Sequence, residues 1–309
     1  MTRPGGVWRL ALGVVAFILM FSPGSLALLG LPLAGLLLAA GPSTARDWVV
    51  VVVAALFGVL AILAPAHAQL DAVINAYIVL VSVAFVSITL LQPASFLRMA
   101  LRATLWATAA VVGLSWVVWG GLPVAALQWE ATREAGRATW MVVEWLPRAV
   151  TLVEPVVRLE SATVPAMLWL ETLAGLALAW QLHVRLARRP LGEPLRPFRE
   201  FRFGDHWIWA VVGALTVWLL PALAALKGAA LNVSVVLAAL YLLRGAAVVA
   251  AFAATTGVSA MALVASAVAA VVLVIPLLVL LPGLCTLGVT DTWLQFRHRL
   301  AGRAPHTRG

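Results

Sequence analysis

The sequence predicts an all-α, polytopic transmembrane bundle with about eight or nine membrane segments and one amphipathic interfacial helix. Of its 309 residues, 63% are hydrophobic and 11% are charged, and the mean hydropathy is +1.04. Ordinary soluble domains are about 45–50% apolar and about 25% charged. This composition therefore excludes both a water-soluble globule and a disordered chain.

The first two apolar segments are short and are separated by the turn signal Ser22-Pro23-Gly24-Ser25. Arg3 and Arg9 precede the first segment, and residues 25–27 resemble a signal-peptide cleavage site. A cleaved signal peptide and a retained first helix both fit. The retained helix is favoured, because the chain is apolar again at once. The predicted membrane segments are 7–21, 26–40, 48–64, 72–91, 103–120, 163–183, 207–226, 229–254 and 258–287.

Prolines complicate the second and the last segment. Pro32 and the pair Gly41-Pro42 are expected to interrupt or end the second segment. The last segment would be about 45 Å long as a helix, which exceeds one crossing of roughly 30 Å and falls short of two. Pro276 and Pro282 are expected to break it. A crossing followed by a re-entrant half-helix, which returns the tail inward, is favoured over a basic tail that lies outside.

A polar connector, residues 121–162, separates the fifth and sixth segments. Ala131, Ala135, Ala138, Val142 and Trp145 recur at helical spacing, while Glu130, Glu134, Arg137, Glu144 and Arg148 share the other face. This pattern predicts an amphipathic helix on the outer membrane surface. Pro147 and Pro155 should end it before the next segment. We expect this amphipathic helix either to rest on the membrane surface or to cover a central cavity as a lid.

Arginines predict the orientation in a bacterial inner membrane. The loop 184–206 is the richest short basic segment, which places it in the cytoplasm. Counting segments puts the N-terminus on the same side, with Arg46, Arg98 and Arg102. The loop's basic patch consists of Arg185, Arg188, Arg189, Arg196, Arg199 and Arg202. The chain is read as one membrane domain, 1–309, made of segments 1–120, the connector 121–162, segments 163–290 and a basic tail 291–309.

No motif assigns a catalytic, metal-binding or cofactor-binding residue. Cys285 is the single cysteine, and no Cys/His cluster has the spacing of a zinc site. No Gly-rich phosphate loop and no Gly-x-Ser-x-Gly elbow is present. The sequence thus predicts no metal, no cofactor and no nucleic-acid partner, and it leaves open whether the protein is an enzyme.

Two charged residues fall inside predicted segments, where an unpaired charge is costly. Arg244 lies near the middle of 229–254, and Glu171 is the only carboxylate placed well within a segment. The two are expected to form a buried ion pair, or Arg244 snorkels and only fixes the helix register, or the two belong to an anion-binding or coupling site. Tyr241 shares a helix face with Arg244, and Asn232 lies two to three turns earlier. These four residues are the candidate ligand-binding set.

Four short stretches in the C-terminal half resemble a known family. They are 201–207 (FRFGDHW), 232–234 (NVS), 239–245 (ALYLLRG) and 287–293 (LGVTDTW), the last followed by Phe296-Arg297. In this order they resemble the YybS-like family of predicted bacterial membrane proteins, a domain of unknown function. Where that family often has Gln before the glycine, this chain has Arg244.

The resemblance implies a layout similar to the substrate-capture subunits of energy-coupling-factor transporters, which bind a small molecule near the outer side. The first hypothesis is therefore a transport-related component that captures a small solute, for which Arg244 would favour an anion. The alternative is a membrane scaffold that docks a cytoplasmic or envelope partner protein through its basic loop and tail. The bilayer itself is the remaining expected partner.

Overall fold

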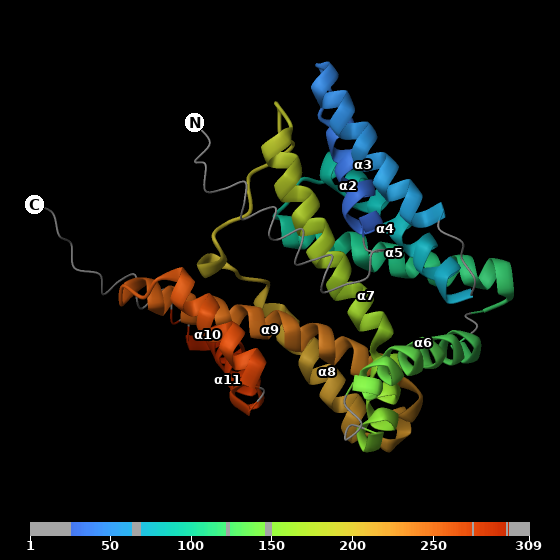
Figure 1. The fold of residues 1–309 in the computed structure, drawn as a ribbon, viewed down its shortest axis with the longest axis vertical. Coiled ribbons are helices and arrows are strands. Elements are labelled where there is room, and N and C mark those ends of the chain that lie inside the picture. The colour runs from blue at the N-terminus through green and yellow to red at the C-terminus, as the bar shows by residue number, and fades with distance from the viewer. Residues whose placement is uncertain are drawn as a thin grey trace, which may run out of the picture. The chain divides into compact units, whose positions relative to one another are not determined.

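The computed structural model describes residues 26–63, 69–121, 124–145, 150–273, 275–294 and 296. Within these residues every regular element is a helix, and their contacts separate two compact units, Met1–Leu195 and Arg196–Gly309 (Figure 1). The first unit holds α2 (Leu26–Ala39), α3 (Ala45–Leu63), α4 (Gln69–Leu91), α5 (Phe96–Trp119), α6 (Val124–Trp145) and α7 (Val150–Leu186). The second holds η3 (Phe198–Glu200), η4 (Asp205–Trp207), α8 (Ile208–Leu219), η5 (Pro221–Leu226), α9 (Lys227–Thr255), α10 (Ala260–Leu273) and α11 (Ile275–Leu294).

The helices confirm an all-α membrane protein. Five of the described stretches are long and apolar enough to cross a membrane: Ala45–Leu63, Gln69–Leu91, Phe96–Val118, Val153–Leu186 and Pro221–Thr255. Two further apolar helices, Leu26–Ala39 and Val279–Leu294, are shorter. The predicted segments from 26–40 onward each coincide with one or two of the helices, whereas the segment 7–21 lies outside the described residues.

In the first unit, α2 is the central helix. It packs against α3, α4 and α7, and Leu28 and Leu36 are fully buried. Gly30 lets α3 approach closely, because a Cβ there would lie 2.6 Å from the carbonyl oxygen of Ala54. Pro32 lies inside α2 and does not interrupt it, which corrects the expectation. The helix ends two residues before Gly41, whose positive φ turns the chain toward α3.

The first part of the connector forms the predicted helix, α6. The rest of the connector differs from the prediction, because α7 already begins at Val150. Ala131 and Ala135 are buried, and α6 packs against α7 and α4. The carboxylate of Glu130 accepts hydrogen bonds from the first two backbone N–H groups of α4, at 3.2 and 2.6 Å. Pro155 does not end the connector, because it lies inside the continuous helix α7. Pro147 lies outside the described residues.

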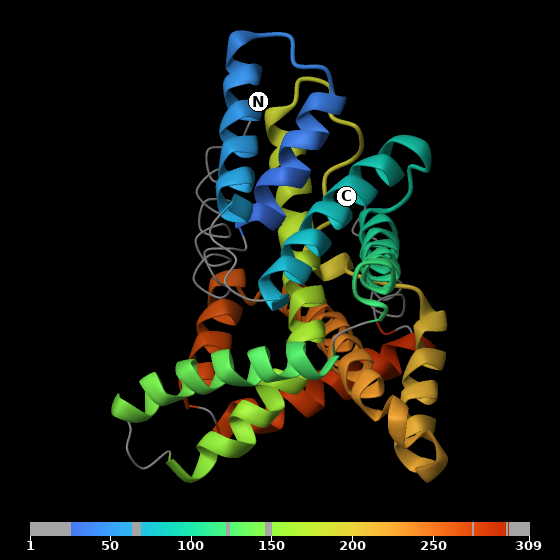
Figure 2. The same ribbon diagram turned by 90° about the vertical axis from the view of Figure 1, so that its right-hand side faces the viewer.

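In the second unit, α9 packs against α11 and α8 (Figure 2). The predicted segment 258–287 is two helices, α10 and α11, which meet next to Pro276. Pro282 lies inside α11 and does not break it. This helix continues to Leu294, so Asp291, which was predicted to begin the tail, is helical.

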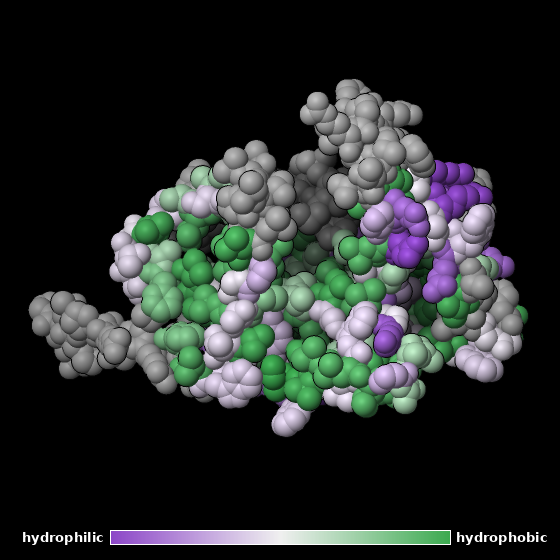
Figure 3. Space-filling view, turned by 90° about the horizontal axis from the view of Figure 1, so that it is seen from below, coloured by the Kyte–Doolittle hydropathy of each residue, from purple (hydrophilic) through white to green (hydrophobic). Residues whose placement is uncertain are grey.

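Apolar side chains dominate the coloured surface in Figure 3, and hydrophilic ones gather in separate patches. Many large apolar residues are exposed along α3, among them Val49, Val52 and Phe57. Exposure of this extent suits a helix whose outer face contacts lipid chains.

Candidate functional site

Arg244 of α9 is the centre of the candidate site. Its side chain is completely buried, with 0% exposed. Its Nε donates to Oδ2 of Asp291 at 3.0 Å, and its Nη1 donates to Oδ1 of Asp205 at 2.8 Å. The Asp291 side chain is 1% exposed and that of Asp205 is 50% exposed. Two charge-assisted hydrogen bonds thus offset the cost of removing the guanidinium from water.

Two aromatic rings form a wall of this cluster. The Phe203 ring lies 5.7 Å from Cζ of Arg244, in cation–π geometry. Tyr241, one turn before Arg244 on α9, packs edge-to-face on Phe203 with ring centroids 4.9 Å apart. The Tyr241 hydroxyl lies near Thr292. The cluster therefore joins α9, α11 and the chain entering α8.

The close crossing of α9 and α11 brings the charges together. A Cβ at Gly245 would collide with the carbonyl oxygen of Leu284, and a Cβ at Gly288 would collide with that of Tyr241. Glycine pairs of this kind allow two helix backbones to approach closely. Gly245 directly follows Arg244, and Gly288 lies three residues before Asp291, so the crossing sets the distance between the two charged side chains.

Aromatic packing fixes Asp205 at the start of η4. Phe198 of η3, Phe201 and Phe203 form a ladder with successive ring centroids 6.4 Å apart. Phe203 is buried, and η3 packs against α9. The irregular segment before α8 is thereby held against α9, with Asp205 beside Arg244.

A surface hollow of about 480 Å³ adjoins the cluster, and Asp205 is the one carboxylate among its described lining residues. The exposed rings of Trp209 and Trp293 contribute to its lining. The other lining residues are His206, Ile208, Val212 and Thr292. The hollow therefore combines one half-exposed carboxylate with a mostly apolar, aromatic wall.

The structure unites two of the four predicted ligand-binding residues, Arg244 and Tyr241. Asn232 lies twelve residues before Arg244, about 18 Å along α9, and its amide donates to the Gly228 carbonyl of its own helix. Glu171 belongs to α7 in the first unit. The carboxylates bound to Arg244 are Asp205 and Asp291, in place of the expected Glu171.

Sequence reasoning missed both aspartates. Asp291 is a buried carboxylate inside an apolar helix. The prediction that Glu171 is the only carboxylate well within a membrane segment is therefore wrong. The signal was present in the stretches 201–207 and 287–293, each of which carries one aspartate. An arginine in the middle of an apolar helix requires acidic partners, and these two were the acids in the stretches singled out beside it.

The six arginines of the basic patch are all exposed. Arg185, Arg188 and Arg189 belong to the first unit, and the other three belong to the second. The loop is ordered next to α7, where Trp180 Nε1 donates to the Glu193 carbonyl at 3.0 Å. The Leu191 N–H donates to Nε2 of the buried His183 at 3.1 Å.

Across the part of the chain that the structure describes, no group of three His, Cys, Asp or Glu side chains could hold a metal ion. The arrangement of the Arg244 cluster offers charge pairing and cation binding. A nucleophile paired with a general base is not part of it.

The fold defines a multi-pass helical membrane protein. Residues 152–292 match a family model described as "Predicted membrane protein (DUF2232)". The match runs from α7 into α11 and contains Phe203, Asp205, Arg244 and Asp291. It confirms the resemblance to a family of predicted membrane proteins of unknown function. No curated protein and no solved structure matches the chain.

The burial of the two aspartates predicts unequal effects on stability. Asp291→Ala should lower the free energy of unfolding by about 3–5 kcal/mol, because it leaves a buried guanidinium short of a partner. Asp205→Ala should cost about 1 kcal/mol, since solvent screens a half-exposed pair. Thermal unfolding of the purified protein in detergent measures both. Thr286→Ala, an exposed change on α11, is the control; equal losses for the two aspartates would contradict the geometry.

Proposed function

We propose that this protein is a transport-related membrane component that captures a small, positively charged solute in the hollow beside Asp205. One observation carries the proposal. Asp205 uses Oδ1 to hold Arg244, yet half of its side chain remains exposed and lines the hollow. A carboxylate in such a place is available to an incoming cation.

The charge of the cluster favours a cation over the anion expected from the sequence. The Arg244 guanidinium already donates to two carboxylates. It is also completely buried, so an anion in the hollow would meet Asp205 first. Like charges at close range repel, and the repulsion is stronger beside an apolar wall than in water. The geometry therefore supports the opposite sign of solute.

The aromatic wall supports an organic cation in particular. Trp209 and Trp293 line the hollow with exposed rings. A cation over the face of a tryptophan is attracted by the ring, and aromatic side chains beside a carboxylate commonly hold quaternary ammonium groups. The hollow's volume of about 480 Å³ falls within the usual range for small-molecule sites.

The family resemblance implies a layout similar to substrate-capture subunits, which supports a capture role by fold-level analogy and not by the position of the site. Those subunits bind near the outer side of the membrane. Asp205 lies near the end of the loop 184–206, which the arginines predict to be cytoplasmic. In that orientation the hollow would open near the inner surface, where it would receive or release the solute.

Binding of choline tests this proposal. Choline should raise the thermal unfolding temperature of the purified protein more than its uncharged carbon isostere does. Trp209→Leu should weaken choline binding roughly tenfold through loss of the cation–π contact, whereas Trp106→Leu, which removes an exposed tryptophan from α5, should leave binding unchanged. Stabilisation by acetate equal to that by choline, or unchanged binding by Trp209→Leu, would contradict a cation site.

The second candidate is a scaffold that docks an acidic partner protein in the cytoplasm. It is favoured by the ordered loop between α7 and α8. Trp180 and His183 hold its first part, and its arginines remain exposed. Exposed basic side chains on a loop whose backbone is anchored suit a partner of opposite charge.

Both candidates depend on the side of the membrane that the loop faces. We propose a bacterial inner membrane with the N-terminus and the loop 184–206 in the cytoplasm. In a Cys285→Ser background, Glu193→Cys should react with a membrane-impermeant maleimide only in inside-out vesicles. Labelling in intact, outer-membrane-permeabilised cells would contradict this orientation and, with it, docking of a cytoplasmic partner.

A further inference from the structure

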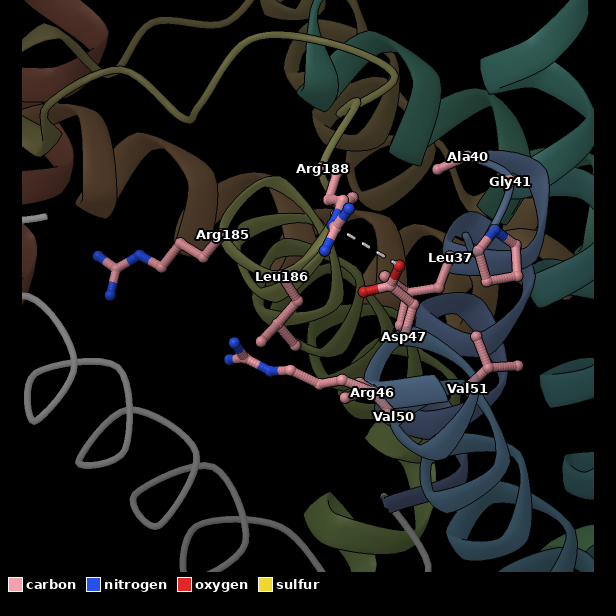
Figure 4. A pocket seen from close by; sticks show the side chains of 12 residues that line it. Leu37, Ala40, Gly41, Arg46, Asp47, Val50, Val51, Arg185, Leu186 and Arg188 are labelled. Carbon is pink, nitrogen blue, oxygen red and sulfur yellow. Dashed lines mark ion pairs between the residues drawn. The ribbon is translucent and has the colours of Figure 1, made fainter. Parts of the chain in front are cut away.

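A basic pocket lies in the first unit, where α2 ends, α3 begins and α7 ends (Figure 4). Its volume is about 150 Å³. Arg46, Asp47, Arg185 and Arg188 supply its charged lining, and its apolar lining comes from residues such as Leu37. The pocket thus brings together basic residues from two distant parts of the sequence.

Positive charge exceeds negative charge in this pocket. Asp47, the one carboxylate among the described lining residues, caps α3 by accepting hydrogen bonds from the backbone N–H groups of Ser43 at 3.1 Å and Thr44 at 3.0 Å. Arg188 Nε approaches the same carboxylate at 4.0 Å. Figure 4 shows Arg188 directed toward Asp47, while Arg46 and Arg185 extend outward. Three arginines and one carboxylate thus line the pocket, and this carboxylate already caps the helix terminus.

The residues around the pocket suit the headgroup level of a bilayer. Trp48, in the first turn of α3, is half exposed, as is usual for tryptophan at a membrane–water interface. Val49, Val52 and Val53 are 60%, 58% and 45% exposed along the same helix. An apolar surface suited to acyl chains therefore begins directly beside the charged pocket.

We propose that this pocket binds the phosphate of an anionic phospholipid headgroup. Arginine donates in a fork that matches two phosphate oxygens, and basic pockets between membrane helices bind anionic headgroups. The excess positive charge favours a lipid with net negative charge over a zwitterionic one. A free phosphate ion would meet the same arginines but would gain nothing from the exposed valines of α3. This site is independent of the proposed solute hollow.

Native mass spectrometry of the purified full-length protein in detergent tests the inference, with phosphatidylglycerol, phosphatidylcholine and inorganic phosphate as probes. Phosphatidylglycerol should bind most tightly. Arg46→Gln combined with Arg188→Gln should weaken its binding roughly tenfold or more. Arg137→Gln combined with Arg158→Gln is the matched control, because it removes the same charge from two exposed ion pairs. The control should bind phosphatidylglycerol as the unchanged protein does.

Three outcomes would overturn the inference. They are equal phosphatidylglycerol binding by the Arg46/Arg188 variant and the unchanged protein, equal binding of phosphatidylcholine, and inorganic phosphate binding as tightly as the lipid. The last would assign the pocket to a free ion. Arg46→Lys with Arg188→Lys keeps the charge and so guards against loss of folding; its affinity should fall between those of the unchanged protein and the glutamine variant, because an ammonium lacks the fork.

Discussion

The buried guanidinium of Arg244 is the constraint on which the C-terminal unit depends. A charge that is fully removed from water must be matched, or the fold loses several kcal/mol. Asp291 matches it from α11 and Asp205 from the chain before α8, so one side chain ties three segments together. Because Asp205 lies at the rim, the same interaction also places a carboxylate beside the hollow. Structural pairing and the proposed cation site thus share one residue.

Close helix contact makes this pairing feasible. Gly245 and Gly288 let α9 and α11 approach so closely that no larger residue would fit at either position. Even a single Cβ atom there would collide with the backbone of the opposite helix. Gly30 has the same role where α2 meets α3. Inside a membrane, where lipid is as apolar as leucine, helices associate by such packing and by polar contacts. Each unit contains at least one place where a glycine lets two helices pack closely. In the second unit, the ion pair between Arg244 and Asp291 joins the same two helices.

Long apolar runs allowed the helices to be predicted, because the bilayer demands them. Their ends were harder to predict. Asp291 was placed in the tail because hydropathy falls after residue 287, yet α11 continues to Leu294. Pro155 was expected to end a helix, but membrane helices accommodate proline when the freed backbone groups are satisfied nearby. The partners of Arg244 depend on tertiary contacts over 39 and 47 residues of sequence, which periodicity does not encode.

A double-mutant cycle between Arg244 and Asp291 tests the central claim most directly. The free energies of unfolding of Arg244→Ala, Asp291→Ala and the double variant are compared in the same detergent. The account predicts that the double variant loses about 1–3 kcal/mol less than the sum of the single losses, and that a parallel cycle with Glu171→Ala is additive. Additive losses for Arg244 and Asp291, or recovery of Arg244→Ala by Glu171→Ala, would contradict it.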